Sequence, residues 1–106
     1  MQTFFCKLIP PRPSFPLDMS EAEVEVMRDH GGYWRTKMTQ GQVVAFGPVF
    51  DPAGAYGLGI IEVTDEAAGR DFMENDPAVR SAVGFRYEMF PMPQGVVHRE
   101  SQASVS

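Results

Sequence analysis

The pattern of hydrophobic and polar positions divides the chain into six main segments. Residues 3–9, 42–50, 56–63 and 84–92 are rich in β-branched and aromatic residues and are bounded by proline, glycine or aspartate, which predicts four strands. Residues 20–40 and 64–75 have helical start signals and helical spacing, and a short helical turn is predicted over residues 76–82. The predicted order is therefore β-α-β-β-α-β.

Capping residues set the expected helix boundaries. Ser20 and Glu23 have the spacing of a capping box, and Gly41 is the expected stop. Thr64 or Asp65 is expected to cap the second helix. The short turn has Asp76 as its predicted cap, with proline at its first helical position.

Two adjacent glycines interrupt the first predicted helix. Gly31 and Gly32 each cost the helix roughly 1 kcal/mol relative to alanine. Such a cost indicates either a bend or close packing, in which a Cβ would block a neighbour or a ligand. We therefore expect Gly31→Ala or Gly32→Ala to lose stability or ligand binding.

The segment between the first strand and the first helix, residues 10–19, contains four prolines and cannot be a helix or a central strand. It is predicted to be an ordered loop, because Phe15 and Leu17 are apolar side chains that it can bury.

The order of elements predicts an α+β, ferredoxin-like fold with a four-stranded antiparallel sheet and two helices on one face. The other face is also apolar, because it carries Phe5, Phe90 and Met92. A homodimer that stacks two such sheets is the expected solution. Residues 1–93 are expected to form the domain, and residues 94–106 a tail that frays at its end and reaches partly across the dimer.

Composition narrows the classes of partner and compartment. A chain of 106 residues makes one domain, and its net charge of −5 argues against nucleic-acid binding. The single cysteine allows no internal disulfide. The apolar N-terminus contains Lys7 and stops at Pro10, which is too short for a membrane span or a signal segment. A cytoplasmic protein is expected.

Motifs for metals, nucleotides and serine nucleophiles are missing from the sequence. The two histidines, His30 and His98, have no metal-ligand spacing with each other or with Cys6. No glycine-rich phosphate loop and no G-x-S-x-G motif occur. Chemistry without a cofactor or a metal, or plain binding of a small organic ligand, remains.

His30 and Asp76 are the candidates for acid–base chemistry. His30 shares a helical stripe with Met27, Trp34 and Met38, so it is either a half-buried core histidine or a general acid or base. Asp76 is either a helix cap or the carboxylate that orients His30, and the two roles are compatible. We expect a ring nitrogen of His30 within hydrogen-bonding reach of Asp76.

Four further residues are candidates for binding a substrate. Trp34 and Tyr56 are either pocket walls or plain core. Arg86, which alternates with Glu88 on the last strand, is either part of an ion network or solvated. Arg12, in the proline-rich loop, either reaches a carboxylate ligand or is exposed.

These motifs, in order, resemble the YCII-related domain family. The resemblance extends from about Phe4 to Met92 and rests on the helix-one histidine, "GPVFDPAGAYGLGIIEV", "DEAAGRDFMENDPAV" and "FRYEMFPM". It implies a dimeric α+β barrel and a site centred on a histidine and an aspartate, which match His30 and Asp76. The family includes a dehydrochlorinase, and the wider fold includes isomerases of muconolactone type. The long proline-rich loop departs from the short members.

Two functions are consistent with these observations. The first is a cofactor-independent lyase or isomerase, in which His30 moves a proton and Asp76 holds its tautomer. The second is a non-catalytic ligand-binding or interaction domain on the same scaffold. An open pocket beside His30 would favour the first function.

Overall fold

The computed structural model describes residues 1–97, so His98 and the predicted end of the tail lie outside the described residues. Seven elements follow one another along the chain. They are β1 (Gln2–Ile9), α1 (Glu21–Thr39), β2 (Val43–Val49), β3 (Tyr56–Val63), α2 (Glu66–Glu74), α3 (Pro77–Arg80) and β4 (Arg86–Pro91). Every predicted element is present, and no boundary differs from its predicted position by more than two residues.

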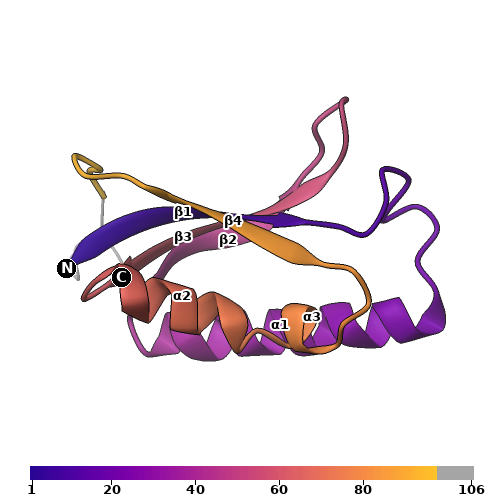
Figure 1. Ribbon diagram of the computed structural model, residues 1–106, viewed down its shortest axis with the longest axis horizontal. Helices are drawn as coiled ribbons and strands as arrows, with labels where there is room; N and C mark the ends of the chain where they lie inside the picture. Colours follow the sequence, from indigo (N-terminus) through magenta and orange to yellow (C-terminus); the bar gives the residue numbers. More distant parts are fainter. Residues whose placement is uncertain (98–106) are drawn as a thin grey trace, which may run out of the picture.

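The four strands form one antiparallel sheet in the order β2-β3-β1-β4. The helices lie on one face of this sheet, and the opposite face has no helix over it (Figure 1). This arrangement confirms the α+β, ferredoxin-like fold.

The predicted caps hold the helix ends. The Ser20 side chain accepts a hydrogen bond from the Glu23 backbone N–H, and the Glu23 carboxylate accepts one from the Ser20 backbone N–H. Asp65 caps α2 and Asp76 caps α3. After the C-cap of α1, Gly41 adopts a φ of 83°, which glycine accepts without strain.

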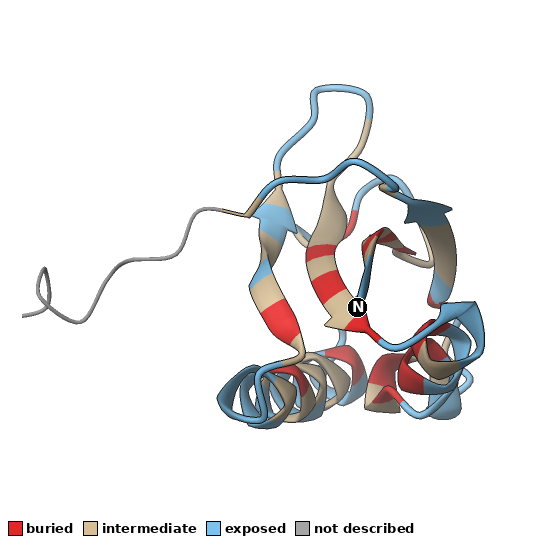
Figure 2. Ribbon diagram, turned by 90° about the vertical axis from the view of Figure 1, so that its left-hand side faces the viewer, coloured by how far each residue is buried: buried red, intermediate tan, exposed pale blue. Residues whose placement is uncertain are grey.

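The core lies between the sheet and the helices, where the buried positions of both layers meet (Figure 2). One cluster joins sheet residues such as Phe4 and Ile61 to Trp34 of α1 and Phe72 of α2. A second cluster lies next to the proline-rich loop and contains Leu8, Phe15, Ala78 and Phe85.

The helix-free face carries the apolar side chains that the alternation in β1 and β4 predicts. The register pairs Phe5 with Phe90, and their rings stack at a centroid distance of 5.7 Å. Phe90 is 45% exposed. A charged pair occupies the same face, where Arg86 donates to Glu88 at 3.1 Å. A single chain therefore leaves this face in contact with water.

The proline-rich loop is ordered, but one prediction about it is wrong. Phe15 is buried against Phe85, whereas Leu17 is 94% exposed. The backbone turns twice in succession, with Phe15 N–H donating to Arg12 C=O and Leu17 N–H donating to Ser14 C=O. Because the chain folds back in this way, only one of the two side chains reaches the core.

The expectation for the helix glycines is also corrected by the structure. A Cβ at Gly32 would meet nothing within 4 Å, and one at Gly31 would meet only the end of the Arg35 side chain, at 3.2 Å. Close packing therefore does not explain either glycine. The glycine that does permit a close approach is Gly59 in β3, where the Trp34 ring packs directly on the backbone.

Candidate functional site

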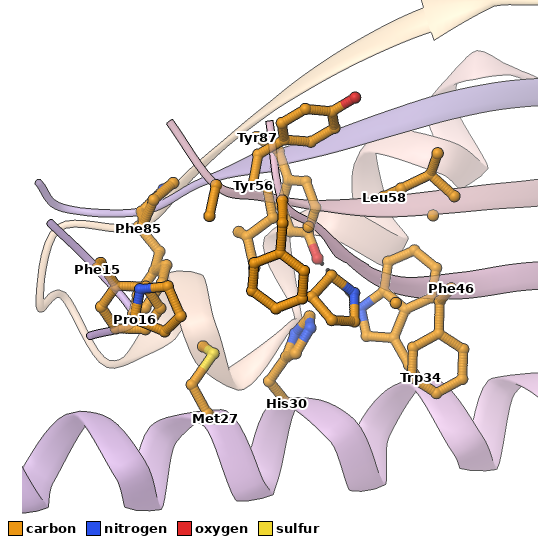
Figure 3. Close-up of a pocket in the computed structure, with 18 of the residues that line it drawn as sticks. Phe15, Pro16, Met27, His30, Trp34, Phe46, Tyr56, Leu58, Phe85 and Tyr87 are labelled. Carbon is orange, nitrogen blue, oxygen red and sulfur yellow. Dashed lines mark hydrogen bonds between the residues drawn. The ribbon is translucent and has the colours of Figure 1, made fainter. Parts of the chain in front are cut away.

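A cavity of about 330 Å³ opens between α1, the sheet and the proline-rich loop. Met27 and His30 rise into it from α1, with Phe15, Pro16 and Phe85 at one end and Trp34 and Phe46 at the other (Figure 3). Its size falls at the lower end of the range for small-molecule sites. Most lining side chains are apolar, so the few polar groups decide the chemistry.

His30 and Asp76 are in contact, as predicted. His30 Nδ1 lies 2.8 Å from Asp76 Oδ2 and 3.1 Å from Oδ1. Asp76 is fully buried, while the His30 side chain keeps 17% of its surface exposed. The histidine therefore borders the cavity, and the aspartate supports it from behind.

Four groups donate hydrogen bonds to the Asp76 carboxylate. Oδ2 accepts from Trp34 Nε1–H at 2.8 Å and from Tyr87 O–H at 2.5 Å, in addition to His30. Oδ1 accepts from the Ala78 backbone N–H at 2.8 Å, which caps α3. Both interpretations of Asp76 therefore hold structurally, since one carboxylate is a helix cap and a partner of the imidazole.

Asp76 is held in its ionised form. Burial by itself would raise the pKa of this carboxyl group, but the hydrogen bond and charge of His30 and the bonds from Tyr87 and Ala78 outweigh it. The pKa of Asp76 consequently lies below its ordinary value. An ionised carboxylate only accepts hydrogen bonds, so Nδ1 of His30 must carry the proton that is shared with it.

This assignment leaves Nε2 of neutral His30 with a lone pair. Within residues 1–97, Nε2 has no hydrogen-bond partner. A histidine held in this tautomer by a carboxylate can accept a proton at Nε2, and the carboxylate then stabilises the imidazolium. The geometry therefore provides one positioned base at the edge of an apolar cavity.

Four separate parts of the chain build this arrangement. The spacing of His30 and Trp34 places both on the sheet side of α1. Trp34 can approach β3 because Gly59 has no side chain. Asp76 arrives from the α2–α3 junction because it must cap α3, and Tyr87 arrives from β4.

The four predicted substrate-binding residues divide into two pairs. Trp34 and Tyr56 line the cavity, whereas Arg12 and Arg86 are outside its lining. Arg86 borders a different depression, which residues of α2 also line. Its side chain pairs with Glu88 on the helix-free side of the sheet.

Arg12 binds carboxylates of the protein itself. Its Nη1 and Nη2 donate to both oxygens of Glu23 at 2.7 and 2.8 Å, and its Nε donates to Asp18 at 3.0 Å. The hydrogen bond to Arg12 lowers the pKa of Glu23 to about 2. Arg12 thus ties the proline-rich loop to the first turn of α1, and through the loop it supports the wall that contains Phe15.

Sequence reasoning missed Tyr87 and most of the aromatic wall. Burial and the negative charge of Asp76 raise the pKa of the Tyr87 hydroxyl, which therefore stays protonated and donates to the carboxylate. The sequence did contain a signal for Tyr87. Strand alternation puts its side chain on the helix-covered face of the sheet, whereas Arg86 and Glu88 lie on the other face. No comparable signal marks Phe46 or Phe85, since apolar strand residues are common in any core.

Among residues 1–97, no three His, Cys, Asp or Glu side chains come together as potential metal ligands. None of the helices in this part of the chain has both the length and the apolar character that crossing a bilayer requires.

Comparisons with known proteins place the chain in a family. A solved structure of an uncharacterized protein, TM1266 from Thermotoga maritima, is similar at 7% sequence identity and a TM-score of 0.47, over 86% of this chain and 95% of that chain. A search of curated proteins found no match. The model of the YCII-related domain matches residues 3–93, which is nearly all of the sequence. The resemblance read from the motifs is thereby confirmed, and the chain belongs to the YCII-related domain family.

Proposed function

We propose that the protein is a cofactor-independent lyase or isomerase in which Nε2 of His30 removes a proton from carbon. One observation carries this proposal: a histidine on the cavity lining has its Nδ1 held by a buried, ionised carboxylate, which leaves Nε2 to meet a ligand. Among the roles open to such a pair, proton transfer is favoured because the other groups that line the cavity are mostly apolar.

The proposed step moves one proton. Nε2 takes a hydrogen from a carbon next to a carbonyl group, and the electron pair of the C–H bond passes into the enolate. Asp76 stabilises the imidazolium that forms. In an isomerase the proton returns to a different carbon, and in a lyase a leaving group departs from the neighbouring carbon with its bonding pair. A positioned base of this kind contributes about 10²- to 10⁴-fold in rate.

The test follows hydrogen–deuterium exchange beside the carbonyl group of 2-indanone in D₂O by proton NMR. We expect the protein to accelerate exchange beyond an equal concentration of free imidazole. His30→Gln should abolish the acceleration and Asp76→Asn should reduce it strongly. Arg86→Gln, on the helix-free side of the sheet, is the matched control and should leave the rate unchanged. No acceleration by the wild-type protein would reject the proposal.

A second candidate function is a non-catalytic binding protein. The apolar lining favours it, because such a surface retains a ligand without any chemistry. Binding of small ring compounds without acceleration of exchange would support this function in place of the first.

We also propose that the protein works as a homodimer through the helix-free face of the sheet. Phe5 and Phe90 lie there with their rings stacked, and covering them would remove apolar surface from water. Sedimentation should give a dimer at micromolar concentration, and Phe90→Asp should give a folded monomer. A wild-type monomer would contradict the proposal.

We further propose a cytoplasmic location. Cys6 is a free thiol buried in the core, and burial raises its pKa to about 12, so it is poorly suited to oxidation. A single cysteine can form no internal disulfide, so the fold does not depend on an oxidising compartment. Cell fractionation tests this, and recovery of the protein outside the cytoplasm would contradict it.

A further inference from the structure

The lining of the cavity carries very little charge. No Lys, Arg, Asp or Glu belongs to it among the described residues, and its polar side chains are His30, Trp34, Tyr56 and Tyr87. The indole N–H of Trp34 and the hydroxyl of Tyr87 are both engaged with Asp76. The polar side-chain atoms of the lining that remain for a ligand are therefore Nε2 of His30 and the hydroxyl of Tyr56.

Two cations lie against residues of the lining, but neither belongs to the lining itself. The guanidinium of Arg12 is bound to Glu23 and Asp18 outside the cavity. The amine of Lys7 lies 4.7 Å from the centre of the Tyr56 ring, on the helix-free side of the sheet. An anionic ligand would therefore find no lysine or arginine side chain in the lining to balance its charge. The ionised Asp76 behind His30 would also repel it.

The size and shape of the cavity restrict the class of ligand further. A cavity of about 330 Å³ corresponds to roughly eleven water molecules at their share of liquid volume, which suits one or two rings. Aromatic side chains meet at both ends of the cavity: Phe15 contacts Phe85 edge-on at 5.2 Å, and Trp34 lies 5.8 Å from Phe46. Aromatic surfaces of this kind favour a flat, apolar partner.

We propose that this cavity takes an uncharged, largely apolar ring compound with a single polar group directed at His30 Nε2, and that it discriminates against carboxylates and phosphate esters of the same size. This inference rests on the proposed function for the location of the site, but it concerns the charge of the ligand and not the reaction.

Benzamide and benzoate test the charge directly, because they have nearly the same size and shape. Each is titrated into the full-length protein at neutral pH, and NMR follows the indole N–H of Trp34 and the ring of His30. We expect benzamide to shift both signals. Benzoate should bind at least about tenfold more weakly, because its charge would lose water without gaining a partner.

Variants at the cavity wall reverse the expected preference. Met27 lines the cavity one turn before His30 on α1. Met27→Lys supplies the missing cation and should bind benzoate more tightly than benzamide, while Met27→Gln, of similar length but uncharged, should keep the wild-type order. Met19→Lys, on the more exposed rim of the same cavity, replaces Met27→Lys if that variant does not fold.

Three results would overturn the proposal. These are benzoate binding to the wild-type protein as tightly as benzamide, no shift of the cavity signals by benzamide up to its solubility, and lysine variants that leave the preference unchanged. The exchange assay separates this inference from the proposed function. Selective benzamide binding without exchange would refute only the catalytic role, whereas exchange together with tight benzoate binding would refute only the ligand class.

Discussion

Asp76→Asn changes one atom of the side chain at the point where four donors converge. The amide keeps one acceptor oxygen and replaces the other with an NH₂ group, which only donates. His30, Trp34 and Tyr87 all donate to Oδ2, and the Ala78 N–H donates to Oδ1. Neither orientation of an asparagine can accept all four bonds.

The less costly orientation keeps the amide oxygen towards Trp34 and Tyr87 and turns the NH₂ group towards Ala78. It loses the cap of α3, worth about 0.5–2 kcal/mol, and leaves buried donors facing each other, which costs about 1–3 kcal/mol. The opposite orientation deprives both Trp34 and Tyr87 of their acceptor. We therefore expect the free energy of unfolding to fall by about 2–5 kcal/mol.

Urea unfolding at neutral pH measures this loss, and nitrogen NMR of His30 reports whether Nδ1 still carries the proton. Asp65→Asn is the matched control, because Asp65 caps α2 from an exposed position and asparagine caps equally well. The control should lose little stability. A loss below about 0.5 kcal/mol for Asp76→Asn, within the range of ordinary surface changes, would refute the reasoning.

Three further predictions concern stability. Gly59→Ala places a Cβ within 2.5 Å of the Trp34 ring and should cost at least about 1–3 kcal/mol in urea unfolding; an unchanged midpoint would show that the ring can move. Gly32→Ala meets open space and should gain up to about 1 kcal/mol, so a loss would restore a packing role. Glu23 has a pKa of about 2 instead of 4.5, so its contribution is complete above pH 4.5 and is lost as the pH falls towards 2. The stability deficit of Arg12→Gln, measured by urea unfolding from neutral pH downward, should therefore shrink across that window, and a constant deficit would contradict the pairing.

Local signals along the sequence were sufficient for the elements and their order. The capping box at Ser20 and the aspartate before Pro77 mark helix starts because caps satisfy backbone groups only a few residues away. The β-α-β-β-α-β order of the elements then limits the chain to one ferredoxin-like sheet. His30 and Asp76 were recognisable as partners because both helices must lie on the same face.

The tertiary structure alone decided how the site is completed. Tyr87 reaches Asp76 from β4, and Arg12 binds Glu23 across the turn into α1. The spacing of these residues along the sequence does not predict either contact. The same limit explains the error at Gly31 and Gly32, since free space around a helix depends on what packs there. Caps and periodicity act within a few residues along the chain, whereas a shared carboxylate and a cavity depend on the packing of elements that are distant in sequence.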